Sequence, residues 1–433
     1  MNVAYLHQLY LAHPLIGTDT RKISPGCIFI ALKGDNFNGN TFAEQALKSG
    51  AAYAVIDEEP AKLDDKFILV DNALAALQQL ASYHRDQLNI PVIGITGSNG
   101  KTTSKELLNA VLRQKFITYS TAGNLNNHIG VPLTLLSITP DIEIAIIEMG
   151  ANHQKEIEQL CSIAKPTCGL ITNVGKAHLE GFGGFEGVKK GKGELYDFLK
   201  ATAGTAFVNA DNRFLTEMSA NRNLEKVTFY GNDDNCLVKG FIVENAPFLI
   251  AEWHYENQSY RVHSNLTGNY NLENILSAIT VGIYFGLSPD EINRGINSYV
   301  PNNNRSQLLK TEKNTLICDY YNANPSSMSV ALDNFASIKA EHKAIILGDM
   351  FELGEESLPE HRAILEKALG LSCDLTIFIG NQFILQKQDS GKGLFFETTE
   401  DAANYLKENS ILNSTVLIKG SRGMKLERLL ELV

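Results

Sequence analysis

The sequence predicts an α/β fold divided into three domains, and three observations support this class. Short apolar runs of strand character alternate with helical patterns, and they group into three blocks. Such alternation is typical of parallel sheets covered by helices on both faces. The length of 433 residues corresponds to about three domains. In the middle of the chain, a glycine-rich turn joins an apolar strand to a helix.

The first block, residues 1–88, is predicted to be a small N-terminal α/β domain. Its strands are expected at residues 27–32, 52–56 and 67–70, and its last helix at residues 73–87. Residues 1–17 have no basic start before an apolar run, so they do not predict a signal peptide.

The second block, residues 89–304, is predicted to be a central parallel-sheet ATPase domain built around the glycine-rich turn. After the turn, a helix is expected at residues 105–115, where leucines and valines recur at helical spacing. Strands are expected at 142–147, 168–172 and 205–208, followed by a β-rich insertion at 227–262 and a helix at 270–285. Three asparagines after Pro301 predict a linker at residues 301–304.

The third block, residues 305–433, is predicted to be a C-terminal Rossmann-like domain. Its strands are expected at 315–319, 343–347, 375–379, 394–396 and 415–418, with a helical segment between each pair.

Composition and charge exclude several classes of partner. The net charge of −11 leaves too few cations for a broad nucleic-acid-binding surface. No apolar stretch approaches the roughly 18–20 residues of a membrane-spanning helix. The six cysteines have no C-x-x-C spacing, which indicates structural thiols in a reducing cytoplasm and no zinc site. We therefore expect a cytoplasmic protein without a membrane span or a nucleic-acid partner.

The turn at residues 94–103 has the features of a phosphate-binding loop. Gly97 and Gly100 permit tight turns, so that backbone N–H groups and the helix start form an anion site. Lys101 supplies a charge for the outer phosphates from an exposed loop end, and the hydroxyl of Thr102 is placed to hold Mg²⁺. Gly94 stands one residue further from Lys101 than the strict pattern requires. The alternative is a turn that binds nothing, but the flanking strand and helix predict ATP binding.

Two other predicted strand ends carry candidate catalytic side chains. Glu148 ends an apolar run, and a carboxylate at the carboxyl end of a parallel strand points into the ligand crevice, where it can bind Mg²⁺. His178 lies just beyond the strand predicted at 168–172. The alternatives are a helix-capping carboxylate for Glu148 and a solvated loop histidine for His178.

Further motifs accompany the phosphate loop and Glu148. They lie at residues 173–178, 180–183, 192–194, 268–274, 304–306, 319–325, 347–354 and 419–423. Together, and in this order, they resemble the Mur ligase family, whose members are ATP-dependent amide-bond ligases of peptidoglycan precursor synthesis. The resemblance spans nearly the whole chain. It implies two Mg²⁺ ions, an acyl-phosphate intermediate and closure of the three domains around it.

The resemblance also gives individual residues roles in catalysis. It implies that Lys101 neutralises the transferring phosphoryl group, that Thr102 and Glu148 hold one Mg²⁺, and that His178 helps to hold a second. Lys192 matches a lysine that is carbamylated in this family, which turns a cation into a carboxylate-like metal ligand. The alternative for Lys192 is a surface lysine on a helix with two other lysines.

The same resemblance assigns the substrate sites. ATP is assigned to Gly97, Ser98, Asn99, Gly100, Lys101, Thr102 and Thr103, with Asn274 and Arg305 at the base and ribose and Asp319 at the ribose. The alternative for Asn274 is a polar residue on a helix. The other substrates are assigned to Thr18, Asp19, Thr20, Arg21, Lys33, Gly34, Asn126, Asn127, Asn322 and Asn324. Asn38 and Asn40 depart from the Asp-Gly-His of many relatives, which leaves their contacts with a UDP-sugar open.

Within the family, residues 121–132, 319–325 and 348–354 resemble the branch that joins D-alanyl-D-alanine to UDP-N-acetylmuramoyl tripeptide. The Asp-Asn-Pro motif of the branch that adds the third residue is absent from the sequence. Two alternatives stay open: a sister ligase that adds a single amino acid, and a non-catalytic, nucleotide-gated binding protein. The third residue of the tripeptide stays open between diaminopimelate and lysine. We expect the chain to act as a monomer.

Overall fold

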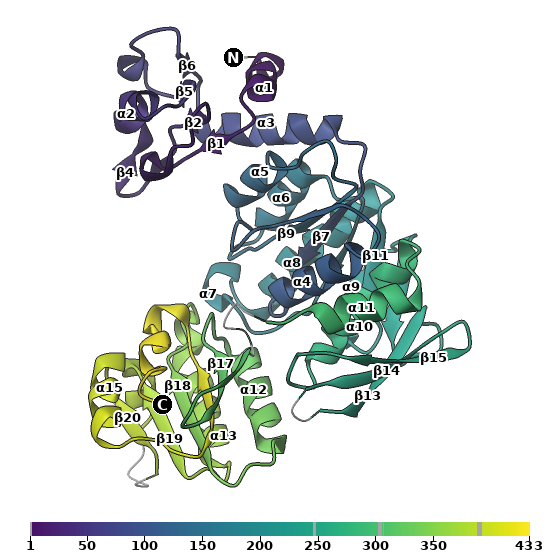
Figure 1. The fold of residues 1–433 in the computed structure, drawn as a ribbon, viewed down its shortest axis with the longest axis vertical. Helices are drawn as coiled ribbons and strands as arrows, with labels where there is room; N and C mark the ends of the chain where they lie inside the picture. Colours follow the sequence, from purple (N-terminus) through teal and green to yellow (C-terminus); the bar gives the residue numbers. More distant parts are fainter. Residues whose placement is uncertain (1, 246–247, 302–304, 306, 388–391) are drawn as a thin grey trace.

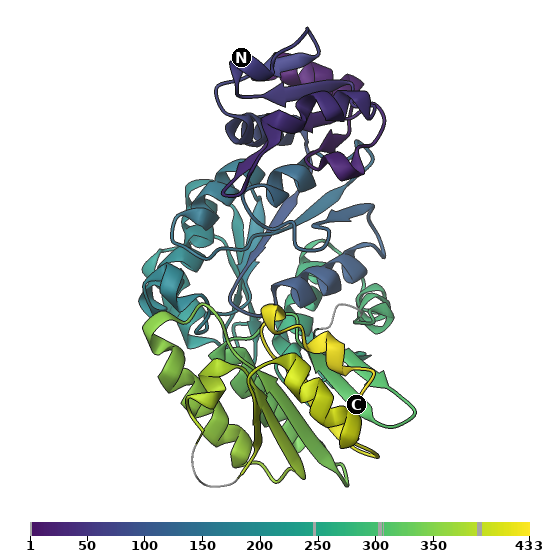
Figure 2. The ribbon, with the colours of Figure 1, turned by 90° about the vertical axis from the view of Figure 1, so that its left-hand side faces the viewer.

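The computed structural model describes the 433-residue chain except residues 1, 246–247, 302–304, 306 and 388–391. The predicted linker at 301–304 therefore lies largely outside the described residues. Three sheets follow one another along the longest axis of the molecule, with the N-terminal segment at one end and the C-terminal segment at the other (Figures 1 and 2). The predicted α/β class is confirmed. No helix in the described part of the chain is long and apolar enough to cross a membrane.

The N-terminal sheet has four parallel strands in the order β1-β2-β5-β6. The strands are β1 (Ile16–Gly17), β2 (Ile28–Ile30), β5 (Tyr53–Ile56) and β6 (Phe67–Leu69), and β3 (Lys33–Gly34) and β4 (Phe37–Asn38) form a small hairpin. The helices are α1 (Val3–Ala12), α2 (Ala43–Lys48) and α3 (Ala73–Gln87). The sequence predicts α3 with these bounds but does not predict α1. Helix α3 packs against α1 and also against helices of the central sheet (Figure 1).

Arg85, near the end of α3, fixes this helix to the central part of the chain. Its side chain is buried, and the guanidinium donates hydrogen bonds to the carbonyl oxygens of Leu88 (2.8 Å), Ala164 (3.0 Å) and Lys165 (3.2 Å). A buried guanidinium needs such acceptors because its five N–H groups have lost water.

The central sheet has nine strands in the order β15-β14-β13-β12-β11-β10-β7-β9-β8. The strands from β8 to β13 pair in parallel, and β13-β14-β15 form an antiparallel edge. The predicted β-rich insertion at 227–262 covers this edge and also the parallel strand β12. The strands are β7 (Val92–Thr96), β8 (Thr118–Ser120), β9 (Ile144–Glu148), β10 (Cys168–Ile171), β11 (Thr205–Asn209), β12 (Val227–Gly231), β13 (Val238–Glu244), β14 (Ile250–Tyr255) and β15 (Gln258–His263). The helices are α4 (Lys101–Leu112), α5 (Gly130–Leu135), α6 (Glu156–Ala164), α7 (Leu179–Phe182), α8 (Phe185–Ala201), α9 (Arg213–Asn221), α10 (Asn271–Tyr284) and α11 (Pro289–Ser298).

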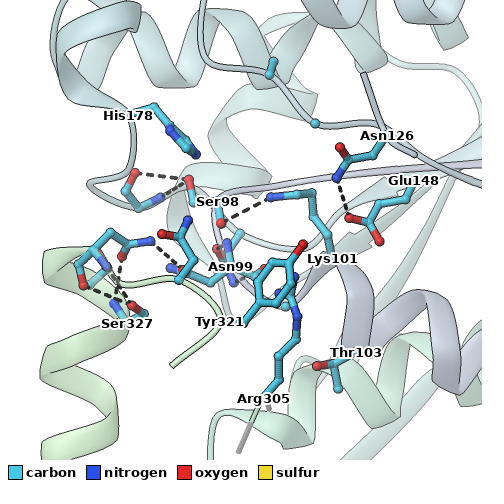
Figure 3. Close-up of a pocket in the computed structure, with 18 of the residues that line it drawn as sticks. Ser98, Asn99, Lys101, Thr103, Asn126, Glu148, His178, Arg305, Tyr321 and Ser327 are labelled. Carbon is cyan, nitrogen blue, oxygen red and sulfur yellow. Dashed lines mark hydrogen bonds between the residues drawn. The ribbon is translucent and has the colours of Figure 1, made fainter. Parts of the chain in front are cut away.

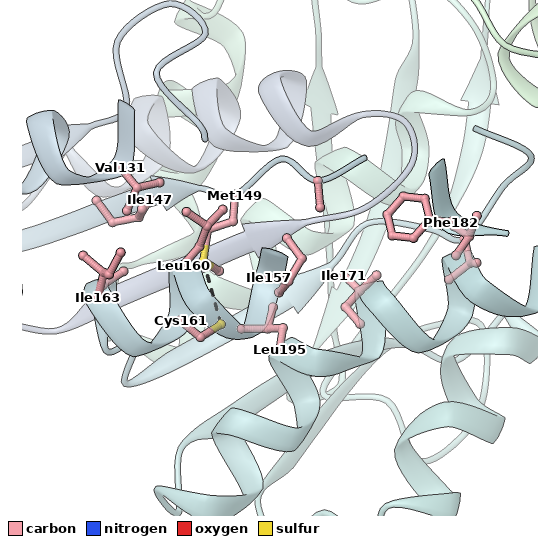
Figure 4. Packing of buried hydrophobic residues seen from close by; sticks show 14 of the residues in the cluster. Val131, Ile147, Met149, Ile157, Leu160, Cys161, Ile163, Ile171, Phe182 and Leu195 are labelled. Carbon is pink, nitrogen blue, oxygen red and sulfur yellow. Dashed lines mark hydrogen bonds between the residues drawn. The ribbon is translucent and has the colours of Figure 1, made fainter. Parts of the chain in front are cut away.

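Strand β9 shows how the central sheet is held between two cores. Ala145 and Ile147 face one hydrophobic cluster, while Ile144 and Ile146 face the other, because side chains alternate along a strand. On the first face, Ile147 lies in the same cluster as residues of α5, α6 and α8, as Figure 4 shows. Helices α4, α10 and α11 supply the cluster on the second face. The two cores fix the strand ends from which the site residues project.

The C-terminal sheet has six strands in the order β16-β17-β21-β18-β19-β20, and only its edge strand β16 is antiparallel. The strands are β16 (Gln307–Lys310), β17 (Thr315–Asp319), β18 (Lys343–Gly348), β19 (Leu375–Ile379), β20 (Leu394–Phe396) and β21 (Thr415–Lys419). The helices are α12 (Pro325–Ser337), α13 (Ser357–Leu369), α14 (Asn381–Ile384) and α15 (Thr399–Glu408). Strand β16 is not predicted because it has no buried residue and so no apolar alternation.

Candidate active site

A cavity of about 610 Å³ opens at the carboxyl ends of the central strands, where the C-terminal domain faces the phosphate loop. The ends of β7, β9 and β10 deliver the phosphate loop, Glu148 and the loop that carries His178 (Figure 3). The C-terminal domain lines the opposite wall with residues at and after the end of β17 and with Lys419, the last residue of β21. This is the position at which parallel sheets bind ligands.

The phosphate loop is held in shape by the neighbouring loop after β10. Gly97 has a φ of 147°, and a Cβ atom there would lie 1.9 Å from Thr172 Oγ1, so only glycine fits. The backbone N–H of Ser98 donates to the carbonyl oxygen of Asn173 (3.1 Å), and the N–H of Asn99 donates to Asn173 Oδ1 (2.9 Å). Gly100, with a φ of 78°, precedes α4. These bonds fix the shape of the loop at the start of α4, where an anion-binding site is expected.

Helix α4 begins at Lys101, so the predicted start at residue 105 is wrong. The first turn of α4 is polar, and an apolar pattern detects only the turns that follow it.

The expectation that Lys101 is an exposed charge is also wrong. Its side chain is half-buried, and its Nζ donates to the carbonyl oxygens of Gly97 (2.6 Å) and Ser98 (3.4 Å). Figure 3 draws the bond to Ser98. Burial lowers the pKa of Lys101 to about 8, although the carboxylate of Glu148 opposes this shift. Among the residues that the structure describes, no carboxylate is in direct contact with this ammonium, and a phosphate group would supply an anionic partner.

Glu148 and the hydroxyl of Thr102 meet below the phosphate loop. Thr102 Oγ1 lies 3.0 and 3.2 Å from the two carboxylate oxygens, and Asn126 Nδ2 donates to Oε1 (2.8 Å). The carboxylate is 1% exposed, and the buried Lys105 ammonium lies 4.0 Å from it. The interpretation of Glu148 as a helix cap does not fit these contacts. A hydroxyl and a carboxylate at this separation are hard oxygen donors that suit Mg²⁺.

Lys192 lies inside the protein, so the alternative of a surface lysine is wrong. Its side chain is 1% exposed, its Nζ donates to the carbonyl oxygen of Ala151 (3.2 Å), and it lies 5.0 Å from the centroid of the Phe182 ring. Burial, and then repulsion by Lys101, lower the pKa of Lys192 well below its ordinary value. The site therefore favours the neutral amine.

His178 lies at the mouth of the cavity and contacts the C-terminal domain. Its residue has a left-handed backbone with a φ of 52°, and its Nδ1 pairs with the carboxylate of Glu352. Burial lowers the pKa of His178, and the nearby cations Lys101 and Lys192 add to this effect against the attraction of Glu352. His178 is thus neither a fully solvated loop histidine nor in contact with Glu148. In the described part of the chain, no group of three or more His, Cys, Asp or Glu side chains could hold a metal ion by itself.

The residues assigned to the nucleotide line one region of the cavity but already have protein partners. Asn274 accepts a hydrogen bond from Ser104 (3.0 Å), and a Cβ atom on Gly100 would lie 2.8 Å from its Oδ1. Asp319 pairs with the buried Lys419 at 2.6 Å. The guanidinium of Arg305 lies 4.0 Å from the centroid of the Tyr321 ring (Figure 3). Asn274 and Asp319 therefore face the cavity and also hold Ser104 and Lys419 in place.

The predicted substrate residues divide into two groups. Asn126, Asn127, Asn322 and Asn324 line the cavity, and Asn324 Nδ2 donates to Asn99 Oδ1 of the phosphate loop at 2.8 Å. The N-terminal set does not reach it: Thr18, Asp19, Thr20, Arg21, Lys33 and Gly34 are absent from the cavity lining. Within that set, Asp19 pairs with Arg21 at 2.8 Å, and Lys33 pairs with Asp57 at 2.9 Å. Asn38 and Asn40 bond to Glu58 and Asp57 of the same domain.

Comparison with known proteins decides the family. Three family descriptions match the chain: "Mur ligase family, catalytic domain" at residues 14–85, "Mur ligase middle domain" at 95–282 and "Mur ligase, glutamate ligase domain" at 304–422. The chain belongs to the Mur ligase family. The resemblance seen in the sequence is therefore confirmed.

Two relatives and two solved structures show how far the similarity of this Mur ligase extends. It is 36% identical to the UDP-N-acetylmuramoyl-tripeptide–D-alanyl-D-alanine ligase of Escherichia coli (strain K12), over 95% of this chain and 92% of the relative. It is 32% identical to the protein of the same name from Bacillus subtilis (strain 168), over 96% and 92%. Its fold matches MurF from Acinetobacter baumannii with a TM-score of 0.88 at 29% identity, over 98% and 97% of the two chains. It matches MurF ligase from Thermotoga maritima in complex with ADP with a TM-score of 0.85 at 27% identity, over 98% and 97%.

Several residues of this Mur ligase site are not identified from its sequence. Asn173 shapes the phosphate loop, Tyr321 stacks on Arg305, Lys419 pairs with Asp319, and Glu273 lines the cavity. All four residues lie inside motifs that carry the family resemblance, which is the signal that could have singled them out. Their contacts could not be predicted, because each joins segments that are distant in the chain or depends on the packed structure.

Proposed function

We propose that this Mur ligase joins D-alanyl-D-alanine to UDP-N-acetylmuramoyl tripeptide and converts ATP to ADP and phosphate. One observation carries the proposal: Lys101 of the phosphate loop and Glu148, which is bonded to Thr102, face residues of the C-terminal domain across one cavity. The relatives named for this reaction, at 36% and 32% identity over nearly the whole chain, support the choice of substrates.

The proposed reaction has two steps. The γ-phosphoryl group of ATP passes to the terminal carboxylate of the tripeptide and gives an acyl phosphate and ADP. The amine of D-alanyl-D-alanine then attacks the acyl carbon, the amide bond forms, and phosphate and a proton leave. The loop N–H groups and Lys101 hold and neutralise the phosphates, so the chain contributes mainly positioning and electrostatic stabilisation.

Mg²⁺ fits the donors at the base of the loop. Thr102 and Glu148 would supply two hard oxygen ligands, and magnesium sites usually add phosphate oxygens and water to one or two protein carboxylates. When bound, Mg²⁺ neutralises charge on the phosphate oxygens. The hydrogen bonds from Thr102 and Asn126 orient the Glu148 carboxylate.

Lys192 is proposed to act as a carbamate and, with His178, to hold a second Mg²⁺. A neutral lysine amine and CO₂ form a carbamate and release a proton, and the burial of Lys192 favours the neutral amine. The carbamate would also place an anion near the ammonium of Lys101, which attracts it.

The remaining assignments extend this proposal. Residues 1–88 would bind the UDP part of the substrate, 89–304 ATP, and 305–433 the amine substrate. The N-terminal residues Asp19 and Lys33 lie away from the cavity, so the substrate would have to bridge the two domains and draw them together. We further propose that the enzyme acts as a monomer in the cytoplasm.

Phosphate release tests the proposal. The enzyme is mixed with ATP, Mg²⁺ and UDP-N-acetylmuramoyl tripeptide, in both the diaminopimelate and the lysine form, against a panel of amines. D-alanyl-D-alanine should react at least about tenfold faster than D-alanine or any other single amino acid, because a site built for a dipeptide leaves polar groups unpaired with a shorter amine. A faster reaction with a free amino acid would assign the enzyme to a sister branch. ADP binding without phosphate release from any amine would indicate a non-catalytic binding protein.

A further inference from the structure

Lys105 is a buried cation beside the proposed magnesium site that the mechanism above does not use. It lies in α4, one turn after Thr102, and its side chain is 1% exposed. Its Nζ donates to the carbonyl oxygen of Thr121 (2.6 Å) and pairs with Glu106 Oε1 (2.9 Å). The second carboxylate near this ammonium is Glu148, whose Oε2 lies 4.0 Å from Nζ. A lysine is almost never fully buried unless it is paired, so its charge belongs to the surroundings of these two carboxylates.

The contact with Thr121 joins Lys105 to the end of strand β9. Thr121 Oγ1 accepts a hydrogen bond from the backbone N–H of Glu148 (2.9 Å), and the N–H of Thr121 donates to the carbonyl oxygen of Ile146 (3.0 Å). Helix α4, the segment after β8 and the end of β9 are thus linked by hydrogen bonds that meet at Thr121. The ammonium of Lys105 therefore has a fixed place beside the Glu148 carboxylate.

Two cations surround Glu148, and a ligand in the cavity can neutralise only one of them. The carboxylate attracts the ammonium of Lys101 as well as that of Lys105. Lys101 lines the cavity, whereas Lys105 is absent from its lining, so a phosphate group can contact Lys101 alone. A divalent cation at the Glu148 oxygens would be repelled by both ammonium groups. This repulsion exceeds the thermal energy at separations of a few ångströms, even in water.

We propose that Lys105 is an internal counter-ion of Glu148 that keeps the metal site weak until nucleotide phosphates are present. The inference rests on the proposed function, in which Thr102 and Glu148 hold Mg²⁺. Without nucleotide, the site offers a metal ion two protein oxygens and the repulsion of two cations. With nucleotide, phosphate oxygens add ligands and negative charge, which outweigh the single charge of Lys105. The protein therefore acquires Mg²⁺ together with the nucleotide and not before it.

Binding of Mn²⁺ to the full chain tests this inference without turnover. Mn²⁺ accepts the same carboxylate, hydroxyl and water oxygens as Mg²⁺, and the electron paramagnetic resonance signal of free Mn²⁺ measures the unbound fraction. Lys105→Met keeps a similar side-chain length but removes the charge. Its affinity for Mn²⁺ without nucleotide should exceed that of the wild type by at least about tenfold, because one repulsive charge near a divalent cation is lost.

Further variants separate charge from packing and locate the bound metal. Lys105→Gln is neutral but can still donate a hydrogen bond, so it should gain Mn²⁺ affinity as Lys105→Met does. Adding Glu148→Gln to Lys105→Met should remove the gain, because the metal then loses its carboxylate ligand. Lys115→Met removes the same charge from an exposed position beyond the end of α4, and this matched control should keep the wild-type affinity.

The failure of the inference and the failure of the proposed function give different results. Neutral variants at Lys105 that bind nucleotide-free Mn²⁺ no more tightly than the wild type would overturn the inference alone, and so would a gain that survives Glu148→Gln. Calorimetry of ADP binding to the wild type, with Mn²⁺ and with a chelator, tests the metal site itself. Mn²⁺ should raise the affinity for ADP at least about tenfold. An ADP affinity that is unchanged by Mn²⁺ would overturn the proposed metal site and, with it, the proposed mechanism.

Discussion

Replacing Lys101 with methionine is expected to abolish turnover and, at neutral pH, to make the folded protein more stable. Methionine has a similar length but no charge, so Lys101→Met removes the cation that faces the transferring phosphate and leaves the loop packed. Electrostatic groups of this kind typically contribute about 10²–10³ in rate, so turnover should fall by at least that factor. The fold should persist, because the loop is held mainly by Asn173 and Thr172.

The stability gain follows from the cost of the half-buried ammonium. The pKa of Lys101 is lowered from 10.5 to about 8, and each pKa unit corresponds to about 1.4 kcal/mol, which gives an upper bound of about 3 kcal/mol. The side chain keeps some solvent contact, and methionine leaves the carbonyl oxygens of Gly97 and Ser98 without this donor. We therefore expect a net gain of about 1–2 kcal/mol, or roughly 3–5 °C in the unfolding midpoint.

The stability difference between Lys101→Met and the wild type should decrease as the pH rises. Below pH 8, Lys101 is charged in the folded and the unfolded chain, so the full penalty is present and the variant has its largest advantage. Between about pH 8 and 10.5 the unfolded state binds more protons, so the wild type gains stability as pH rises and the difference closes. Thermal unfolding at several pH values from 7 to 10 measures it, with Lys190→Met, at an exposed position on α8, as the control. A variant less stable than the wild type at pH 7, or a difference that does not change with pH, would refute the reasoning.

Two further predictions concern buried cations with other tasks. Lys192→Ala should lower turnover by about 10²-fold, and a short-chain carboxylic acid should restore part of it. Removal of bicarbonate should slowly inactivate the wild type but not the rescued variant. An alanine variant of undiminished activity would exclude the carbamate. Arg85→Met should destabilise the protein by about 3 kcal/mol, because the carbonyl oxygens of Leu88, Ala164 and Lys165 lose a buried donor. Urea unfolding measures the loss against the exposed Arg113→Met, and a change of less than about 1 kcal/mol would show that water replaces the guanidinium.

The local elements follow from the sequence because their signals are local. Helix α3 and the strands β17 and β19 have the predicted bounds, since apolar periodicity and flanking turn residues define them within a few positions. The phosphate loop and Glu148 are found in the same way: a glycine spacing and a strand end are visible in one short segment. The elements that are not predicted, such as α1 and β16, either lack a distinct apolar pattern or lie at an edge.

The state of each site residue depends on contacts between segments that are far apart in the chain. Asn324 reaches Asn99 across 225 positions, and Glu352 reaches His178 across 174. Lys192 has two lysines as near neighbours in sequence, yet it alone is buried, because the helix turns it towards Ala151 and Phe182. Burial and the surrounding charge set a pKa, and both are properties of the packed structure. The sequence therefore determined the order of elements and the residue types available for catalysis, whereas only the tertiary structure decided which of those residues are buried, neutral or paired.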